Sequence, residues 1–327
     1  MATRQKIMDK VLEILQQKSW KALKEAKDQL LVEKIQSKVA REALEYYIEN
    51  WNDTTHPGIL ALACEAVGGD AERVIPVQIA MLYLSAATDL HDDIIDQCKV
   101  KSGKPTVFGK YGRDITLLLG DAMMIKGLTT LCYYAKEYAP ETFEKIVHEI
   151  ENKLFDLGNA HLLEVDLKRK LEVLPNRYLR ILEKKASSIA ICTKIGAIVG
   201  GSSSQEVEAL ESYGKILGLL IGLREDFADI FEPGELKNRM ENEILPLPIL
   251  YVLKNTKIKR EILHILRKSK VTEEETGKIV DYVFRDERTK RLQRYMRKLA
   301  REALSIVANI DKEGNLELLI EGVLEDI

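Results

Sequence analysis

Two short acidic segments contain the residues of this chain that are best suited to chemistry. Their acids share one spacing, i, i+1 and i+4, and are Asp92, Asp93 and Asp96 (the first acidic motif) and Glu225, Asp226 and Asp229 (the second acidic motif). Residues four apart on a helix project from the same face, so each motif gathers its carboxylates. Two carboxylates about 4 Å apart repel by roughly 4 kcal/mol at an effective dielectric constant of 20. Each motif therefore needs cations nearby.

The type of ligand in the two motifs favours magnesium. Carboxylate oxygens without cysteine or histidine partners suit Mg²⁺ better than Zn²⁺, and Mg²⁺ usually shares its coordination shell with substrate phosphates. An apolar run, residues 79–84 or 216–221, precedes each motif. We therefore expect metals at the mouth of one pocket with an apolar tunnel below, and a substrate that is phosphorylated and apolar. A solvated acidic face is the ordinary alternative for a single motif, and the matched pair argues against it.

The elements that position these motifs are helices. Apolar residues recur at helical spacing almost everywhere, and the few glycines and prolines permit long helices. Breaks are expected at residues 52–58, 68–70 and 99–105. A mostly apolar stretch occupies residues 59–67, and helices are expected at residues 4–18, 21–49, 71–97, 112–137, 141–166, 176–200, 205–231, 247–254, 257–268, 272–284, 286–309 and 315–326. No linker or composition shift divides the chain. The sequence predicts an all-α fold with one domain, residues 1–327, built as a single large helical bundle.

Composition excludes several other classes of protein. With 46% hydrophobic and 31% charged residues, a chain of 327 residues can form both a large core and a solvated surface. A net charge of −3 with intermixed signs gives no general attraction to nucleic acid. The four cysteines form no CxxC pair, the N-terminus is charged, and no apolar run reaches the ~20 residues needed to cross a bilayer. We expect a soluble, cytoplasmic protein with reduced cysteines.

Several segments resemble the trans-isoprenyl diphosphate synthases (polyprenyl synthetases). The resemblance extends from about Pro57 to Tyr251 and is best at residues 63–70, 91–96, 103–106 and 119–121. It implies a helical isoprenoid-synthase bundle with a central apolar cavity and a homodimer, with a heterodimer as the alternative. It also implies that the two acidic motifs hold three Mg²⁺ ions around an allylic diphosphate, whose departure leaves an allylic cation. Asp92, Asp96 and Asp226 would be the principal ligands.

Two lysines would steady the leaving group under the same resemblance. Lys185 matches a family lysine that touches the allylic diphosphate, although the threonine usual beside it is Ala186 here. Lys101 follows the first acidic motif and supplies a second cation there. Positive charge from metals and ammonium groups stabilises negative charge as the C–O bond breaks.

The chain departs from the family where the second substrate, isopentenyl diphosphate, is usually held. A family lysine falls on Asp53, a family arginine falls on His56, and a second arginine falls on Ser102. The formal charge changes by −2, −1 and −1, or −4 in all. The family glutamine before the second motif is Gly222, and the lysines usual after that motif are missing from residues 233–247. The allylic half is kept, and the isopentenyl half looks dismantled.

The leading hypothesis is therefore an enzyme that ionises a long allylic prenyl diphosphate, of about C20, with an acceptor other than isopentenyl diphosphate. Cyclisation or hydrolysis of the terpene-synthase type is one alternative. Ordinary chain elongation, as in a geranylgeranyl or polyprenyl diphosphate synthase, is another if Lys99, Lys101 or Lys104 restores the lost charge. Two further alternatives are a non-catalytic subunit of a heteromeric synthase and a prenyl diphosphate carrier.

Small residues before the first motif bear on chain length. In the family, bulky aromatics four and five residues ahead of the motif close the tunnel, whereas this chain has Thr88 and Ala87. We expect a tunnel that reaches Leu84 and Ala80, with ordinary helix packing as the alternative. Elsewhere, the basic segment at residues 285–301 is read as a solvated helix face, with peripheral contact to anionic lipid as its alternative.

Overall fold

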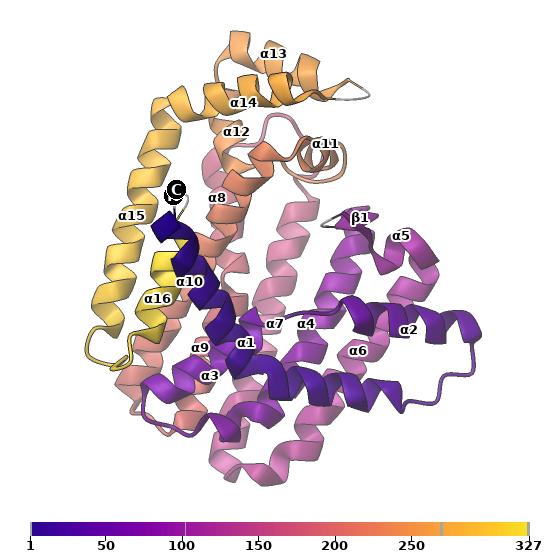
Figure 1. Ribbon diagram of the computed structural model, residues 1–327, viewed down its shortest axis with the longest axis vertical. Coiled ribbons are helices and arrows are strands. Elements are labelled where there is room, and N and C mark those ends of the chain that lie inside the picture. The colour runs from indigo at the N-terminus through magenta and orange to yellow at the C-terminus, as the bar shows by residue number, and fades with distance from the viewer. Residues whose placement is uncertain (1, 102, 269–270, 326–327) are drawn as a thin grey trace. The chain divides into compact units, whose positions relative to one another are not determined.

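The computed structural model describes residues 2–101, 103–268 and 271–325, and this part of the chain is helical except for one two-stranded hairpin (Figure 1). The all-α prediction is confirmed. Two compact units divide the chain. The first-motif unit consists of Asp9–Ile150 and Cys192–Val207, and the second-motif unit consists of Met1–Met8, Glu151–Ile191 and Glu208–Ile327. Each unit contains one acidic motif, and a single domain with a central cavity stays a prediction.

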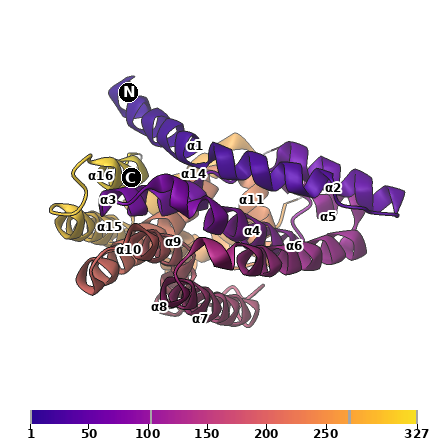
Figure 2. The same ribbon diagram turned by 90° about the horizontal axis from the view of Figure 1, so that it is seen from below.

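The first-motif unit is organised around α4, which is buried along most of its length. Its elements are α1 (Ala2–Leu31, from residue 9), α2 (Lys38–Asn50), α3 (Thr55–Ala66), η1 (Ala71–Val74), α4 (Ile75–Ile95), β1 (Val100–Lys101), β2 (Lys104–Pro105), α5 (Val107–Tyr111), α6 (Arg113–Tyr133), η2 (Tyr134–Glu137), the start of α7 (Pro140–Val165) and the end of α9 (Ser187–Gly200). Helices α4 and α6 pack along each other (Figure 1), and α1 and α2 contribute to the same core (Figure 2).

Close packing of α4 against α6 depends on two glycines of α6. A Cβ atom at Gly127 would lie 2.8 Å from Leu84 Cδ2, and one at Gly120 would lie 2.5 Å from His91 Nε2. At Gly127 the α4 backbone itself is close, since the Ala80 carbonyl oxygen would lie 3.1 Å from the Cβ atom, whereas at Gly120 the His91 imidazole packs directly on the glycine. This contact holds the end of α4, where the first acidic motif begins, against α6.

The second-motif unit contains the remaining helices. These are most of α7, α8 (Pro175–Lys185), the start of α9, most of α10 (Ser204–Ala228), η3 (Asp229–Phe231), α11 (Pro233–Asn242), α12 (Leu247–Val252), α13 (Thr256–Leu266), α14 (Glu273–Arg285), α15 (Glu287–Val307) and α16 (Asn315–Val323). Helix α14 starts with a capping box between Thr272 and Glu275. Helices α15 and α16 pack side by side in both views (Figures 1 and 2).

Several expected helix boundaries were wrong. Helix α1 continues to Leu31 without the break expected near residue 20, and the chain turns at residues 32–37 instead. Ser37 then begins α2, because its side chain accepts a hydrogen bond from the N–H of Ala40 at 3.3 Å. Helix α3 begins at Thr55, although residues 52–58 were expected to be a break. The helix expected at 315–326 extends into residues that lie outside the described part of the chain.

The expected helix at residues 176–200 divides into α8 and α9 at Ala186, a position crowded by α10. A Cβ atom at Gly218 of α10 would lie 2.8 Å from the Ala186 carbonyl oxygen. Three short elements were not expected: α5, α11 and the hairpin of β1 and β2. Helix α5 has five residues, α11 has ten, and each strand of the hairpin has two. Segments this short show no clear hydrophobic period.

One helix in the described residues is long and apolar enough to cross a membrane. It comprises Arg113–Glu137, which is α6 with the η2 turn, and differs from the expectation that no apolar run reaches this length. Length and composition of a single helix are weak evidence for a membrane span, because core helices of soluble proteins meet the same criteria. Helix α6 packs on α4, and its Leu119 and Met123 belong to the core cluster that includes buried residues of α4.

Candidate functional site

The first acidic motif lies at the C-terminal end of α4. Asp92 and Asp93 lie in its last turn, and Asp96 is the C-cap residue, whose N–H donates to the Asp92 carbonyl at 2.7 Å. The C-terminus of a helix is the negative end of its dipole and favours cations over carboxylates. Backbone and side chains therefore concentrate negative potential at the same place.

Neighbouring acids perturb the protonation of this motif. Loss of hydration, opposed by Lys101 and reinforced by Asp89 and Asp96, raises the pKa of Asp93 to about 7. In turn, Asp89 raises the pKa of Lys101, with smaller contributions from Asp93 and Asp92. Three acids, Asp89, Asp92 and Asp93, thus act on Lys101, and their formal charges outnumber its single positive charge. A divalent cation would relieve this imbalance, so the donor set fits Mg²⁺.

The acids of the first motif would hold a metal together with ligands from outside the protein. In the part of the chain that the structure describes, no group of three or more His, Cys, Asp or Glu side chains is arranged to hold an ion. Mg²⁺ ordinarily completes its octahedral shell with water and substrate phosphate oxygens. The first acidic motif is therefore suited to an ion that arrives with a diphosphate.

A hydrogen-bonded group of three side chains occupies the place where the resemblance puts two family cations. Asp53 Oδ2 lies 2.9 Å from His56 Nδ1 and accepts a hydrogen bond from Ser85 Oγ at 2.9 Å. The His56 N–H also donates to Asp53 Oδ1, at 3.3 Å. Burial alone would raise the pKa of Asp53, but His56 and Ser85 bring it below its ordinary value. Asp53 is therefore a well-stabilised anion near α4.

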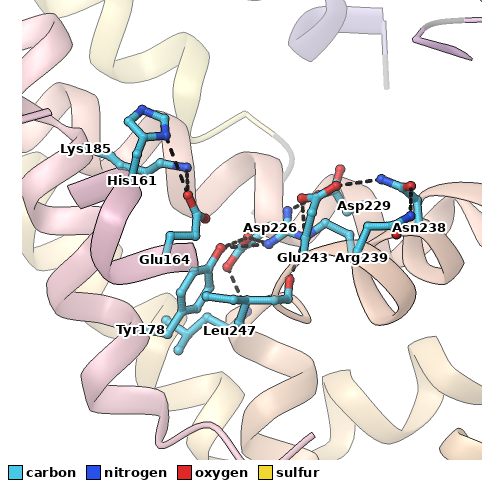
Figure 3. A network of polar contacts seen from close by, with 12 residues as sticks. His161, Glu164, Tyr178, Lys185, Asp226, Asp229, Asn238, Arg239, Glu243 and Leu247 are labelled. Carbon is cyan, nitrogen blue, oxygen red and sulfur yellow. Dashed lines mark hydrogen bonds and ion pairs between the residues drawn. The ribbon is translucent and has the colours of Figure 1, made fainter. Parts of the chain in front are cut away.

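The second acidic motif is closely surrounded by donors from its own unit (Figure 3). Asp226, at the end of α10, is 1% exposed, and both of its oxygens accept hydrogen bonds. Oδ1 accepts from Tyr178 Oη at 3.1 Å and from Arg239 Nη2 at 2.8 Å, and Oδ2 accepts from the Leu247 N–H at 2.7 Å. Glu225, the preceding residue on α10, is exposed. Asp226 and Glu225, neighbours in the second acidic motif, therefore differ in burial.

Arg239 of α11 is the cation of this network. Its Nη1 donates to Asp229 Oδ2 at 2.6 Å, its Nη2 donates also to Tyr178 Oη at 2.7 Å, and its Nε donates to the Ile244 carbonyl at 2.8 Å. Burial disfavours the charged guanidinium, but Tyr178, Asp226 and Asp229 outweigh it and raise the pKa of Arg239. For Asp229, desolvation raises the pKa to about 6 against the effect of Arg239.

Lys185, at the end of α8, is paired with an acid that the sequence did not single out. Its Nζ lies 2.5 Å from Glu164 Oε2, and His161 Nδ1 lies 3.9 Å from the same oxygen (Figure 3). Burial alone would raise the pKa of Glu164, but Lys185 brings it below the ordinary value. The ammonium is thus fixed in position by Glu164, and its predicted contact with a diphosphate stays a prediction.

The remaining predicted site residues lie on α4 or beside it. Leu84 and Ala87 are buried in the core, Thr88 is half-buried with its hydroxyl donating to the Ser85 carbonyl, and Lys101 is exposed on β1. The structure does not test whether a tunnel extends past them. Ser102 lies outside the described residues, and the meeting of the two acidic motifs across one cavity also stays a prediction.

Sequence reasoning missed the partners that complete these groups. Arg239 and Glu164 each lie in a helix among other charged residues, so composition gave no reason to choose them. Tyr178 is one of twelve tyrosines. Only the spacing of Arg239, ten residues after Asp229 and across a helix start at Pro233, hints that the chain folds back toward the motif.

The fold and the acidic motifs together define a class of protein, and comparison with family models agrees. Residues 37–283 match the model described as polyprenyl synthetase. This match covers well over half of the chain and both acidic motifs, so the chain belongs to the polyprenyl synthetase family and is a prenyltransferase-family enzyme.

Individual relatives carry more specific names. The chain is 29% identical over 237 residues to the geranylgeranyl diphosphate synthase of Methanosarcina mazei, which covers 72% of each protein. It is 26% identical over 271 residues to the geranylgeranyl diphosphate synthase of Saccharolobus solfataricus, covering 82% of this chain and 78% of the relative. Among solved structures, geranylgeranyl pyrophosphate synthetase from Pyrococcus horikoshii aligns with a TM-score of 0.84 at 21% identity, covering 98% and 99% of the two chains. At that identity the likeness shows the fold alone.

Proposed function

We propose that this chain elongates an allylic prenyl diphosphate with isopentenyl diphosphate to a product of about C20. The observation that carries this proposal is the family match across both acidic motifs, with relatives named geranylgeranyl diphosphate synthases. These comparisons favour ordinary elongation over the leading sequence hypothesis of another acceptor. Lys101 supports it from the structure, because it keeps a cation beside the first acidic motif where family arginines are absent.

In this proposal the first acidic motif, Glu225 and Asp229 bind Mg²⁺ together with the diphosphate of the allylic substrate, and the family resemblance implies three ions. Bound Mg²⁺ would supply positive charge that stabilises the departing diphosphate. Lys101 would donate to diphosphate oxygens beside the motif. Lys185, positioned by Glu164, would donate to the leaving group as the C–O bond breaks.

The test measures incorporation of labelled isopentenyl diphosphate by the purified full chain with Mg²⁺ and primers of five, ten, fifteen and twenty carbons. We expect incorporation and pyrophosphate release that require both substrates, and a product of about C20. Asp92→Asn should abolish both, whereas Asp114→Asn, which removes an exposed acid at the start of α6, should not. Pyrophosphate release from a C20 primer without isopentenyl diphosphate would refute elongation, and no release under any condition would favour a carrier or a non-catalytic subunit.

One observation favours a second candidate, transfer to an acceptor other than isopentenyl diphosphate. Asp53 with His56 and Ser85 occupies the place of the two family cations, and an anion there repels a second diphosphate. The double variant Asp53→Lys/His56→Arg separates the candidates. Under elongation, wild type already incorporates isopentenyl diphosphate. Under the second candidate, wild type does not, and the double variant gains incorporation while keeping its melting temperature.

We also propose a cytoplasmic homodimer assembled through α6. Large apolar side chains on the α6 face turned away from α4 stay exposed, among them Leu118 at 64% and Ile125 at 63%. They recur at intervals of seven and three residues with Leu128, which places them on one helix face. A second copy of the same face is self-complementary under two-fold symmetry and would cover them.

A further inference from the structure

The two acidic motifs have the same spacing, but the contacts of Asp226 differ from those expected of a metal ligand. A carboxylate has about four lone-pair directions. Three donors approach Asp226, at 2.7, 2.8 and 3.1 Å, and they come from α8, α11 and the start of α12. Three of these directions are taken, and at 1% exposure the carboxylate has little open space in which an ion could reach the fourth. Asp226 therefore does not fit the role of a principal ligand that its sequence position predicts.

Arg239 has an equally committed set of contacts. Its side chain is 11% exposed, and four hydrogen bonds bind its N–H groups, two to carboxylates, one to Tyr178 Oη and one to the Ile244 carbonyl. The planar guanidinium spans Asp226 and Asp229 at once, which a lysine ammonium on a flexible stem would not do. Glu243 Oε2 lies 3.6 Å from Nε and adds a third acid at the rim.

This arrangement assigns a separate task to each acid of the motif. Asp226 contacts Arg239, Tyr178 and a backbone N–H, and it is buried. Asp229 is half-buried and has one oxygen on Arg239 Nη1. Glu225 is exposed. Formal charges of −3 for the motif and +1 for Arg239 leave −2.

We propose that Asp226 is a positioning residue and not a metal ligand: it holds Arg239 as a built-in counter-ion, and Arg239 orients Asp229. Metal coordination by the second acidic motif is left to Glu225 and Asp229. This inference rests on the proposed function only in that a metal binds near the motif, and it adds a structural cation to the predicted Mg²⁺ sites. It concerns contacts within the second-motif unit alone.

The test compares Asp226→Asn with Glu225→Gln, a matched pair of neighbouring residues that each lose one negative charge. Mn²⁺ binding to the full chain is measured with inorganic pyrophosphate by electron paramagnetic resonance, and unfolding is followed by calorimetry. We expect Asp226→Asn to keep the Mn²⁺ affinity within about two-fold and to lower the melting temperature by roughly 5–10 °C, since it leaves a buried guanidinium short of an acid. Glu225→Gln should weaken Mn²⁺ binding at least ten-fold at unchanged melting temperature. Loss of a Mn²⁺ equivalent in Asp226→Asn with an unchanged melting temperature would overturn the proposal.

If Asp226→Asn does not fold, Arg239→Lys tests whether Arg239 is a structural counter-ion. Lysine keeps the charge but cannot span both acids, so the melting temperature should fall by several degrees while Mn²⁺ stoichiometry stays that of wild type. A wild-type melting temperature in Arg239→Lys contradicts the role of a counter-ion. Because neither readout depends on turnover, the elongation proposal can fail while this inference stands, and the reverse also holds.

Discussion

Charge placed on the exposed face of α6 should dissociate the proposed homodimer. The double variant Leu118→Glu/Ile125→Glu replaces two apolar side chains that are 64% and 63% exposed. Full burial of such a side chain is worth ~1.5–3 kcal/mol. With about two thirds of each side chain still to be buried, each contributes ~1–2 kcal/mol in an interface.

Two-fold symmetry multiplies this effect, since each position occurs once in either protomer. Four side chains then contribute ~4–8 kcal/mol, and about 1.4 kcal/mol corresponds to a ten-fold change in the dissociation constant. The double variant should therefore weaken dimerisation by at least about a thousand-fold. Buried glutamates would add to the loss, because desolvating a charge is costly.

Analytical ultracentrifugation over a range of nanomolar to tens of micromolar protein measures the effect. The matched control is Leu12→Glu/Trp20→Glu, which changes two other exposed apolar residues of the same unit, at 54% and 51% exposure, on α1. We expect the control to stay dimeric and the α6 variant to be a folded monomer with unchanged helical circular dichroism. A dimer with wild-type affinity in the α6 variant, or a wild type that is monomeric at all concentrations, would refute the assignment of this face.

Two further changes test the packing and the ion pairs near the site. Gly120→Ala should displace His91, and with it the first acidic motif, and should reduce elongation activity at least ten-fold. Its control is Gly158→Ala, where a Cβ meets nothing within 4 Å; this variant should keep activity and stabilise α7 by ~1 kcal/mol. Steady-state kinetics and thermal unfolding measure both variants. Because Lys185 brings the pKa of Glu164 below its ordinary value of 4.5, their ion pair stabilises the fold above that pH and loses its contribution as pH falls. Glu164→Gln should therefore lose less unfolding free energy between pH 6 and pH 3 than wild type, and an equal loss would contradict the pairing.

The sequence predicted the helical class and the positions of both acidic motifs, because these depend on local periodicity and spacing. Apolar residues every three to four positions identify α4 and α10, and acids at i, i+1 and i+4 share a face wherever the segment is helical. Helix ends were predicted less well. The break after Leu31 depends on Ser37 as a cap, and the break at Ala186 depends on the close approach of Gly218, a contact between distant parts of the chain.

Ion pairs between residues distant in the sequence could not be predicted either, because they too depend on tertiary contacts. Asp226 and Arg239 are thirteen residues apart and meet only because α11 turns back after Pro233. Glu164 and Lys185 meet because α7 and α8 pack together, which no periodicity shows. A residue's charge can be read directly, but its counter-ion is decided by tertiary structure.

Identical spacing therefore does not give the two motifs identical chemistry. At the first motif the helix dipole adds negative potential and loss of hydration raises the pKa of Asp93 to about 7, so a cation bound there would be stabilised. At the second motif Arg239 already neutralises part of the charge from within. If metal and diphosphate bind as proposed, the first motif should dominate the metal affinity, and the second should contribute through Glu225, which is exposed, and Asp229, which is half-buried.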